Sequence, residues 1–391
     1  MVKNWFRRLR HVASVFALCV SSLFFGDMSS AQEQPLSTAM REEIVLIKKQ
    51  GGVFTTELET TFFRPPGTGP FPVAIINHGK SPVQPKFQSR YRGIVAAREL
   101  VSRGYMVALP NRQGFSKSTG IYVGGGCNVQ SNGEAQADDV VATIQFIQTL
   151  ADADAKKIVV LGQSHGGLTT MALGSLGSEK LVGVKGLINF AGGLRNDGCT
   201  GWEATLVRAF GSYGKSTTLP SLWFYGDNDS YFQPWLFKDM HKQYVDAGGP
   251  ARLVAFGIFS GDSHSLFGSP AGVAIWAPEV DAFLAQIGLP NQKIHRINLI
   301  GHQLPPPAAS GFAKFNDETA VPFLKENGRA GYLRFLQADR PKAFAIAPNG
   351  AWAYFVGRAD AMKVAVDRCN ENAKADVCKL YSVDDEVVWL P

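Results

Sequence analysis

The chain has 391 residues, of which 45% are hydrophobic and 18% are charged, a composition ordinary for a globular protein. Its formal net charge is +6, but no basic tract or basic helix face remains beyond the N-terminal segment. The composition therefore indicates a folded protein and argues against a nucleic-acid-binding function.

Residues 1–31 have the pattern of a secretory signal peptide. Four basic residues precede an almost uninterrupted apolar run, Val12 to Phe25, and small residues precede a cleavage site after Ala31. The run is shorter than the about 20 residues that a transmembrane helix needs. The segment holds four basic residues and one acidic residue, so the rest of the chain has a formal charge of +3. We therefore expect an exported protein, periplasmic or secreted, without an integral membrane span.

From residue 40 to residue 290, short apolar runs alternate with longer amphipathic stretches. Residues 42–65 are typical of a leading antiparallel pair, and the later runs have the length and Gly or Pro boundaries of buried parallel strands. This alternation predicts a mostly parallel sheet with helices on both faces, an α/β fold. The expected strands are 71–79, 105–111, 157–162, 185–192, 220–227 and 251–257, and the expected helices are 88–104, 133–152, 236–248 and 273–288.

The character of the sequence changes after Pro290. A Pro-rich break at 302–311 precedes a mixture of helical and aromatic, strand-like patches, and the Pro-Asn-Gly turn within 343–357 predicts a hairpin. The charged stretch 383–389 is typical of an edge strand. We expect three parts: the signal peptide 1–31, an α/β catalytic domain at 32–290 that carries the motifs below, and a C-terminal α+β extension at 291–391.

Ser164 lies in the sequence GQSHG, directly after the apolar run KIVVL and before a helix-compatible stretch. This G-x-S-x-G pattern is typical of a nucleophile elbow, in which a strained strand-to-helix turn exposes the serine hydroxyl. Glycines two positions before and after are needed where a side chain would collide with the adjoining strand or helix. The pattern also occurs as a structural turn in Gly-rich chains, but this context favours a nucleophile.

A serine nucleophile needs a base and a residue that orients the base. His264 lies in the loop after the strand 251–257, and the loop after 220–227 offers Asp227 and Asp229. The order Ser, acid, His is the order expected in a sheet of this type. Asp227 lies directly at the strand end and Asp229 is two residues further into the loop, so we expect Asp229 to be the acid, with Asp227 as the alternative.

Two backbone amides are candidates for an oxyanion hole. The strand in 71–79 ends in His-Gly-Lys, so the amide of Lys80 can point at a developing oxyanion together with the amide of His165. We expect His78 to orient this loop. His165 adjoins the serine, but its side chain leaves the elbow in another direction, so we expect its amide to take part and its ring to line the pocket.

These residues resemble the α/β-hydrolase superfamily, and within it the dienelactone hydrolase-like and prolyl oligopeptidase-like branch. PPGTGPFPVAIINHG (65–79) is similar to that branch's entry into the His-Gly strand, and GYMVALPNRQGFSKSTG (104–120) is similar to its following stretch. The resemblance covers about residues 50–288 and implies no cofactor and the roles of nucleophile, acid and base for Ser164, Asp229 and His264. Dienelactone hydrolases have cysteine at the elbow, so dienelactone itself is not the expected substrate.

Four cysteines follow the signal segment, an even number that suggests disulfides in an exported protein, with three possible pairings. Cys369 and Cys378 are close in sequence and most simply pair together, which leaves Cys127 with Cys199; four buried thiols are the alternative. Both Cys127 and Cys199 follow strands, so their bond would close a loop over the pocket rim. Aromatic residues of the same loops either form the pocket or pack between loops: Phe115, Tyr122, Trp202, Tyr231 and Phe232.

The sequence therefore predicts an exported serine hydrolase that cleaves carboxylic esters through an acyl-enzyme on Ser164. Its expected partner is a small-molecule ester, and the spacing of His and Cys residues does not indicate a metal site. A peptidase or amidase of the prolyl oligopeptidase-like type is the alternative within the same fold, and a non-catalytic binding module is the alternative from another class.

Overall fold

The computed structural model describes residues 36–50, 55–81, 84–297, 304–338, 341–375 and 377–391. The expected signal peptide, residues 1–31, lies outside these described residues. Across the described part of the chain, none of the helices combines the length and the apolar character that crossing a bilayer requires.

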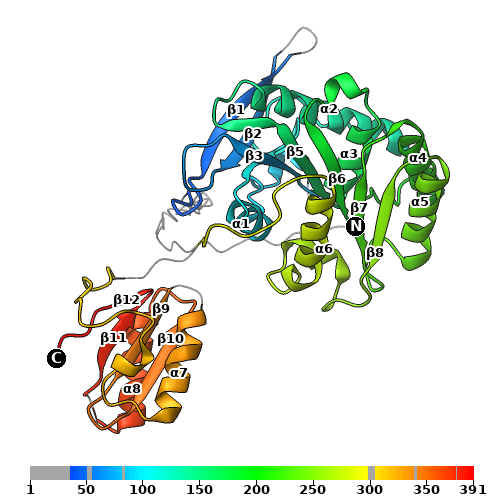
Figure 1. The fold of residues 1–391 in the computed structure, drawn as a ribbon. Helices are drawn as coiled ribbons and strands as arrows, with labels where there is room; N and C mark the ends of the chain where they lie inside the picture. The colour runs from blue at the N-terminus through cyan, green and yellow to red at the C-terminus, as the bar shows by residue number, and fades with distance from the viewer. Residues whose placement is uncertain (1–35, 51–54, 82–83, 298–303, 339–340, 376) are drawn as a thin grey trace, which may run out of the picture. The chain divides into compact units, whose positions relative to one another are not determined.

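Eight strands between residues 43 and 255 form one sheet (Figure 1). They are β1 (Glu43–Lys49), β2 (Thr56–Phe63), β3 (Phe71–Asn77), β4 (Met106–Pro110), β5 (Ala153–Gln163), β6 (Val184–Phe190), β7 (Ser221–Tyr225) and β8 (Ala251–Ala255). The strand order is β1-β2-β4-β3-β5-β6-β7-β8. The last six strands in this order are parallel, and β1 and β2 form the expected antiparallel pair at one edge. This is the α/β-hydrolase fold, as the sequence predicted.

Helices cover both faces of this sheet and give it two cores. They are α1 (Ile94–Ser102), α2 (Val129–Ile147), α3 (His165–Gly174), α4 (Trp202–Ser216), α5 (Pro234–Asp246) and α6 (Val273–Gln286). Apolar residues of α2, α3, α4 and α5 pack on one face, and those of α1 and α6 pack on the other (Figure 1). Burial of residues 158–162 of β5 between the two cores explains their continuous apolar run, because neither face of this part of the strand meets water.

Helix α4 was not among the helices predicted from the sequence. It contains Gly211 and Gly214, which lower helix propensity by about 1 kcal/mol each relative to alanine. The structure gives Gly214 a packing reason, because a Cβ at this position would lie 2.2 Å from the carbonyl oxygen of Tyr244 on α5. Close packing of α4 against α5 therefore overrides the low local propensity.

The C-terminal residues form a second, antiparallel sheet. Its strands are β9 (Lys342–Ile346), β10 (Trp352–Val356), β11 (Lys379–Val383) and β12 (Glu386–Val387), in the order β10-β9-β11-β12. The expected hairpin of 343–357 is the β9–β10 pair, and the expected edge strand in 383–389 is β12.

The two faces of this second sheet differ in side-chain size. Phe344 and Ile346 face the aromatic core under α7 (Glu326–Gln337), whereas Ala343 and Ala345 face α8 (Ala361–Ala373). This follows from the period of two along a strand. Short 3₁₀ helices complete the structure at Pro85–Phe87, Ser178–Lys180, Ser263–Gly268 and Glu318–Ala320.

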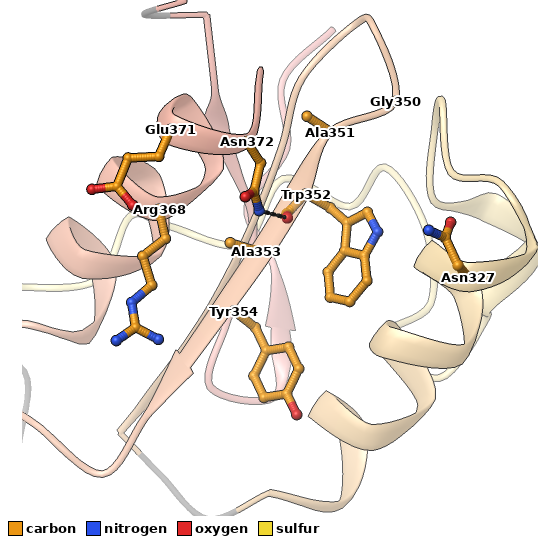
Figure 2. A pocket seen from close by; sticks show the side chains of 9 residues that line it. All are labelled: Asn327, Gly350, Ala351, Trp352, Ala353, Tyr354, Arg368, Glu371 and Asn372. Atoms are coloured by element: carbon orange, nitrogen blue, oxygen red, sulfur yellow. Dashed lines mark hydrogen bonds between the residues drawn. The ribbon is translucent and has the colours of Figure 1, made fainter. Parts of the chain in front are cut away.

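A pocket of about 770 Å³, called here the edge pocket, lies along the edge strand β10 (Figure 2). Trp352 and Tyr354 point from β10 toward α7, and the side-chain amide of Asn372 on α8 donates a hydrogen bond of 2.9 Å to the carbonyl oxygen of Trp352. The charged side chains in the pocket, Arg368 and Glu371, are exposed on α8. The full lining is Asn327, Gly350, Ala351, Trp352, Ala353, Tyr354, Arg368, Glu371 and Asn372.

Candidate active site

Ser164 occupies the sharp turn between β5 and α3. Its backbone has φ 57° and ψ −124°, a conformation in which a non-glycine residue is strained. A Cβ on Gly162 would lie 2.0 Å from the carbonyl oxygen of Gly166, and a Cβ on Gly166 would lie 2.0 Å from that of Asn77. The two glycines therefore permit the close strand–helix contact that holds the turn, which explains the G-x-S-x-G spacing.

The main chain of Ser164 is fixed on both sides. Its amide donates a hydrogen bond of 2.9 Å to the carbonyl oxygen of Phe190 at the end of β6, and its own carbonyl oxygen accepts a hydrogen bond of 3.0 Å from Gly193. The strain at the turn is thus held by main-chain contacts with the neighbouring strand and the loop that follows it. The side chain of Ser164 is left at the carboxyl edge of the sheet, where ligands bind in folds of this kind.

Two adjoining hollows, called here the serine pocket, meet at Ser164. They have volumes of about 400 and 560 Å³ and share Lys80, Ser81, Ser164 and Tyr231. The larger hollow also contains His264 and residues 87–92, and the smaller contains residues 193–195, Asp197 and Phe232. The expected nucleophile and the expected base therefore line one continuous cavity.

The structure brings His264 together with Asp229. The His264 Nδ1 atom lies 3.0 Å from Asp229 Oδ2 and 3.2 Å from Oδ1. Asp229 is only 2% exposed, whereas Asp227, the alternative acid in the sequence, is exposed and its amide donates to the carbonyl oxygen of Gly257. The geometry therefore favours Asp229 as the partner of the imidazole.

Neighbouring backbone groups hold this pair in place. Asp229 Oδ1 accepts hydrogen bonds from the amides of Tyr231 (2.8 Å) and Phe232 (3.0 Å), which fix the orientation of the carboxylate. The amide of His264 donates to Asp262 Oδ1 at 2.9 Å, and the ring of Tyr231 packs 4.5 Å from the imidazole. The imidazole is thus fixed in orientation by its own backbone and by the acid.

Asn228 ties the acid loop to the histidine loop. Its Oδ1 accepts a hydrogen bond of 3.1 Å from the amide of Phe259 and another from the hydroxyl of Ser263, and its Nδ2 donates to the carbonyl oxygen of Ser260 at 3.1 Å. In addition, the side-chain amide of Gln163, the residue before the serine, donates to the carbonyl oxygen of His264 at 3.0 Å. The loops that supply the serine, the acid and the histidine are therefore joined directly.

The two expected oxyanion donors lie beside the serine. Lys80 and His165 both line the smaller hollow with Ser164. Because His165 is the first residue of α3, its amide is one of the N–H groups that have no partner within the helix. The loop of Lys80 is braced by Gln88, whose side chain donates to the carbonyl oxygen of Gly79 (3.0 Å) and accepts from the amide of Ser81 (2.9 Å).

The rings of His78 and His165 are buried away from this role. His165 Nε2 donates to Asn132 Oδ1 at 2.7 Å, and its Nδ1 accepts from the guanidinium of Arg112 at 3.0 Å. His78 Nε2 accepts from the amide of Arg112 at 3.2 Å. Burial, together with the charge of Arg112, lowers the pKa of both histidines well below its usual value of 6.5. Both rings are therefore neutral structural groups. His165 was expected to line the pocket and is among the residues that line the smaller hollow, but it is only 1% exposed and both of its ring nitrogens are hydrogen-bonded.

Both expected cysteine pairs are bonded in the structure. Cys127 and Cys199 form one disulfide and Cys369 and Cys378 form the other. Cys199 closes the loop after β6, whose residues 193–195 and Asp197 line the serine pocket. The first disulfide therefore anchors part of the pocket rim to the start of α2.

Only two of the five expected aromatic rim residues, Tyr231 and Phe232, are among the residues that line the serine pocket. Phe115 is fully buried, with its ring 4.7 Å from that of His78 and 5.4 Å from that of Tyr122. Tyr122 accepts a hydrogen bond from Asn132, and Trp202 packs against the core beside α4. Phe115 and Tyr122 therefore pack between loops and Trp202, the first residue of α4, packs on the core, so none of the three is among the residues that line the serine pocket.

Several polar residues of the site were not predicted from the sequence. They are Gln88, Arg112, Asn132 and Gln163, together with the Arg195–Asp197 ion pair at 2.8 Å in the pocket wall. Within the residues that the structure describes, no group of three or more His, Cys, Asp or Glu side chains is arranged to hold a metal ion.

The sequence matches one family model, X-Pro dipeptidyl-peptidase (S15 family), over residues 52–212. No curated protein matches the chain. Similar solved structures include an esterase from Pyrococcus furiosus (16% identity, 63% of this chain and 91% of that chain, TM-score 0.47) and Est1E from Butyrivibrio proteoclasticus with bound ferulic acid (19%, 62% and 98%, 0.44). A dipeptidyl peptidase 4 from Porphyromonas gingivalis is 20% identical, with 63% of this chain and 35% of that chain covered and a TM-score of 0.48. The observed sheet order is that of the α/β-hydrolase fold, and with the family match over residues 52–212 it supports a hydrolase of the esterase or peptidase type.

Proposed function

We propose that the chain is an exported serine hydrolase that cleaves carboxylic esters through a covalent acyl-enzyme on Ser164. The observation that carries this proposal is the strained Ser164, which shares a pocket with His264, while His264 Nδ1 is held 3.0 Å from the buried carboxylate of Asp229. A nucleophile, a base and an orienting acid are the groups that acyl transfer requires.

The mechanism follows from these roles. The Ser164 hydroxyl attacks the ester carbonyl while His264 Nε2 takes its proton, and Asp229 stays ionised and stabilises the imidazolium. The amides of Lys80 and His165 donate to the oxyanion of the tetrahedral intermediate. His264 then returns the proton to the departing alcohol. In the second half, water attacks the acyl-enzyme with His264 again as base, and the acid leaves as Ser164 recovers its proton.

The charges of the serine pocket favour an ester over a peptide with a free N-terminus. Among the described residues that line it, the cationic side chains are Lys80, Arg90, Arg92 and Arg195, and the one carboxylate is Asp197. Arg195 Nε binds both oxygens of Asp197, at 2.8 and 3.0 Å. An N-terminal ammonium would therefore find no uncompensated carboxylate in this pocket.

A dipeptidyl peptidase is the second candidate, because the family model that matches residues 52–212 describes X-Pro dipeptidyl-peptidases. Turnover of p-nitrophenyl acyl esters compared with X-Pro anilides distinguishes the two, and we expect the esters to be cleaved and the anilides not. Faster turnover of the anilides would overturn the ester assignment.

The serine role has its own test. A fluorophosphonate probe should label Ser164 in the wild-type protein, and Ser164→Ala should abolish labelling and lower ester turnover by at least about three orders of magnitude. Absence of labelling in the folded wild-type protein would instead favour a non-catalytic binding module.

Export is proposed from the sequence pattern of residues 1–31 and is supported by the two disulfides, which persist in oxidising compartments. N-terminal sequencing of the protein released by a bacterial host should give Gln32 as the first residue. A cytoplasmic protein that retains Met1 would contradict it.

A further inference from the structure

Arg112 is a buried arginine that contacts both loops of the proposed oxyanion site. It lies two residues after β4 and is 0% exposed. Its Nη2 donates to the carbonyl oxygen of His78 at 2.8 Å and to His165 Nδ1 at 3.0 Å, and its Nε donates to the side chain of Gln136 at 3.1 Å. Its own amide also donates to His78 Nε2. One guanidinium nitrogen thus joins the end of β3 to the start of α3.

The two groups that this nitrogen joins stand next to the two amide donors. The carbonyl of His78 lies two residues before Lys80, and the ring of His165 belongs to the residue whose amide is the second donor. His165 is held from its other side by Asn132, at 2.7 Å, so its ring has no freedom to move with the substrate. A change in the position of Arg112 would therefore change the separation of the two donors.

The burial of Arg112 without an ion-pair partner indicates a functional role in addition to a packing role. Among the described residues, no carboxylate lies within ion-pair distance of Arg112, and its Nη1 atom is buried without a hydrogen-bond partner. Asp139 is nearby, but it is already bound by Lys49 at 2.6 Å. Burial lowers the pKa of Arg112 to about 10. A buried, unpaired cation is destabilising, and such groups concentrate at functional sites.

Arg103 provides the contrast within the same sheet. It is also buried, at 2% exposed, but it bonds to the carboxylates of Glu99 at 2.9 Å and Asp281 at 2.6 Å. These contacts tie α1 to α6, on the face of the sheet that carries the second core. Arg103 is therefore a compensated structural arginine, whereas Arg112 is left uncompensated beside the serine.

We propose that Arg112 is a positioning residue for the oxyanion site, which fixes the spacing of the Lys80 and His165 amides and thereby stabilises the tetrahedral intermediate without touching the substrate. This inference rests on the proposed serine hydrolase function. The planar guanidinium of Arg112 is required because its Nε is held by Gln136 while its Nη2 donates to the carbonyl and the imidazole, and a lysine ammonium has no second nitrogen to be anchored in this way.

The test compares Arg112→Gln with Arg103→Gln in the full-length protein. We expect Arg112→Gln to lower kcat for a p-nitrophenyl ester by about 10²-fold, as loss of one oxyanion donor does, with KM changed by less than about threefold. The inhibition constant of an alkyl boronic acid, which forms a tetrahedral adduct with the serine, should rise by a similar factor. Arg103→Gln should lower the melting temperature and leave kcat and the inhibition constant unchanged.

Arg112→Lys supplies the same comparison if Arg112→Gln does not fold, and we expect its kcat to stay below about a tenth of the wild-type value. Parallel changes in kcat and boronate affinity support the inference. A rise in KM alone, or equal losses of kcat in the Arg112 and Arg103 variants, overturns it. If the wild-type protein is neither labelled by fluorophosphonate nor active on esters, the proposed function is wrong, and so is this inference. If the wild-type protein is labelled and active, the results for the Arg112 variants test this inference alone.

Discussion

The serine pocket and the edge pocket show that size and chemistry are separate properties of a cavity. The edge pocket, at about 770 Å³, is larger than either hollow of the serine pocket, and its charged side chains are exposed on a helix surface. Each hollow of the serine pocket is smaller, but the two meet at a strained serine, close to a buried carboxylate and two buried histidines whose pKa values are lowered. Strain and buried polar groups, which cost stability, mark the reactive site better than volume does.

Two arginines, one beside each pocket, show the same contrast between a buried and an exposed environment. Arg112 lies over the ring of Phe115 at 5.3 Å, and Arg368 lies over the ring of Phe355 at 4.8 Å. The first is fully buried beside the serine pocket, and the second is exposed in the wall of the edge pocket. An identical aromatic contact therefore accompanies two different roles, and burial distinguishes them.

The largest expected effect comes from the acid of the serine pocket. We expect Asp229→Asn to lower kcat by about three to four orders of magnitude, because the amide no longer holds the imidazole in the required tautomer or stabilises its charge. Asp227→Asn is the matched control two residues away, and it should retain ester turnover within about threefold. Steady-state kinetics on both variants measures this, and the reverse ranking would assign the acid role to Asp227.

The next largest effect is expected from removing the disulfides, because one lies in each of the two regions. Cys127 and Cys199 are separated by 72 residues and Cys369 and Cys378 by 9. In the chain-entropy model, loss of the first lowers the free energy of unfolding by about 4 kcal/mol and loss of the second by about 2.5 kcal/mol. Double Cys→Ser variants, measured by urea unfolding, test this. Only the first should lower ester turnover, because its loop lines the serine pocket. Equal losses of ester turnover in the two double variants would contradict this prediction.

Acid should destabilise the serine region through its buried histidines. The pKa of His165 is lowered in the folded state, so below pH 6.5 the unfolded chain binds a proton that the folded chain does not. The free energy of unfolding should therefore decrease as the pH is lowered below 6.5, by about 1.4 kcal/mol per pH unit for each such histidine. His165→Gln keeps one donor and one acceptor and removes the titration. Urea unfolding at pH 7, 6 and 5 should show a shallower slope for this variant, and identical slopes would contradict the assignment.

The smallest effect is expected in the edge pocket. Arg368→Gln removes an exposed cation–π contact and should change the free energy of unfolding by about 0.5 kcal/mol or less. Ester turnover should stay at the wild-type rate. A thermal unfolding curve and an ester assay on this variant are sufficient, and a loss of turnover would show that the two regions act together.

Local pattern was sufficient to predict the framework of the serine site. The glycines around Ser164, the alternation of apolar runs and the order of Asp229 and His264 all depend on neighbours in sequence or on strand order, which the pattern determines. The β9–β10 hairpin was also predictable from local sequence, because Pro-Asn-Gly is a sequence typical of a turn. Long, regular segments were therefore predicted well.

Contacts between distant loops were not predictable in the same way. Arg112, Asn132 and His165 come from the loop after β4, from α2 and from α3, and their contacts depend on how these distant segments pack together. For the same reason the sequence left open whether Phe115 forms the pocket or packs between loops, and in the structure its ring packs against His78. Helix α4 was missed because its glycines serve a tertiary contact that its own sequence does not reveal.

The hydrogen bonds of Asn228 have a practical consequence for producing the protein. Asn228-Asp229-Ser230 matches the acceptor sequence for N-linked glycosylation, and the nitrogen that would carry the sugar is the Nδ2 atom that donates to Ser260. A glycan there would break this bond and force apart the loops that hold Asp229 and His264. Expression through a eukaryotic secretory pathway should therefore yield inactive enzyme, and a bacterial host avoids the modification.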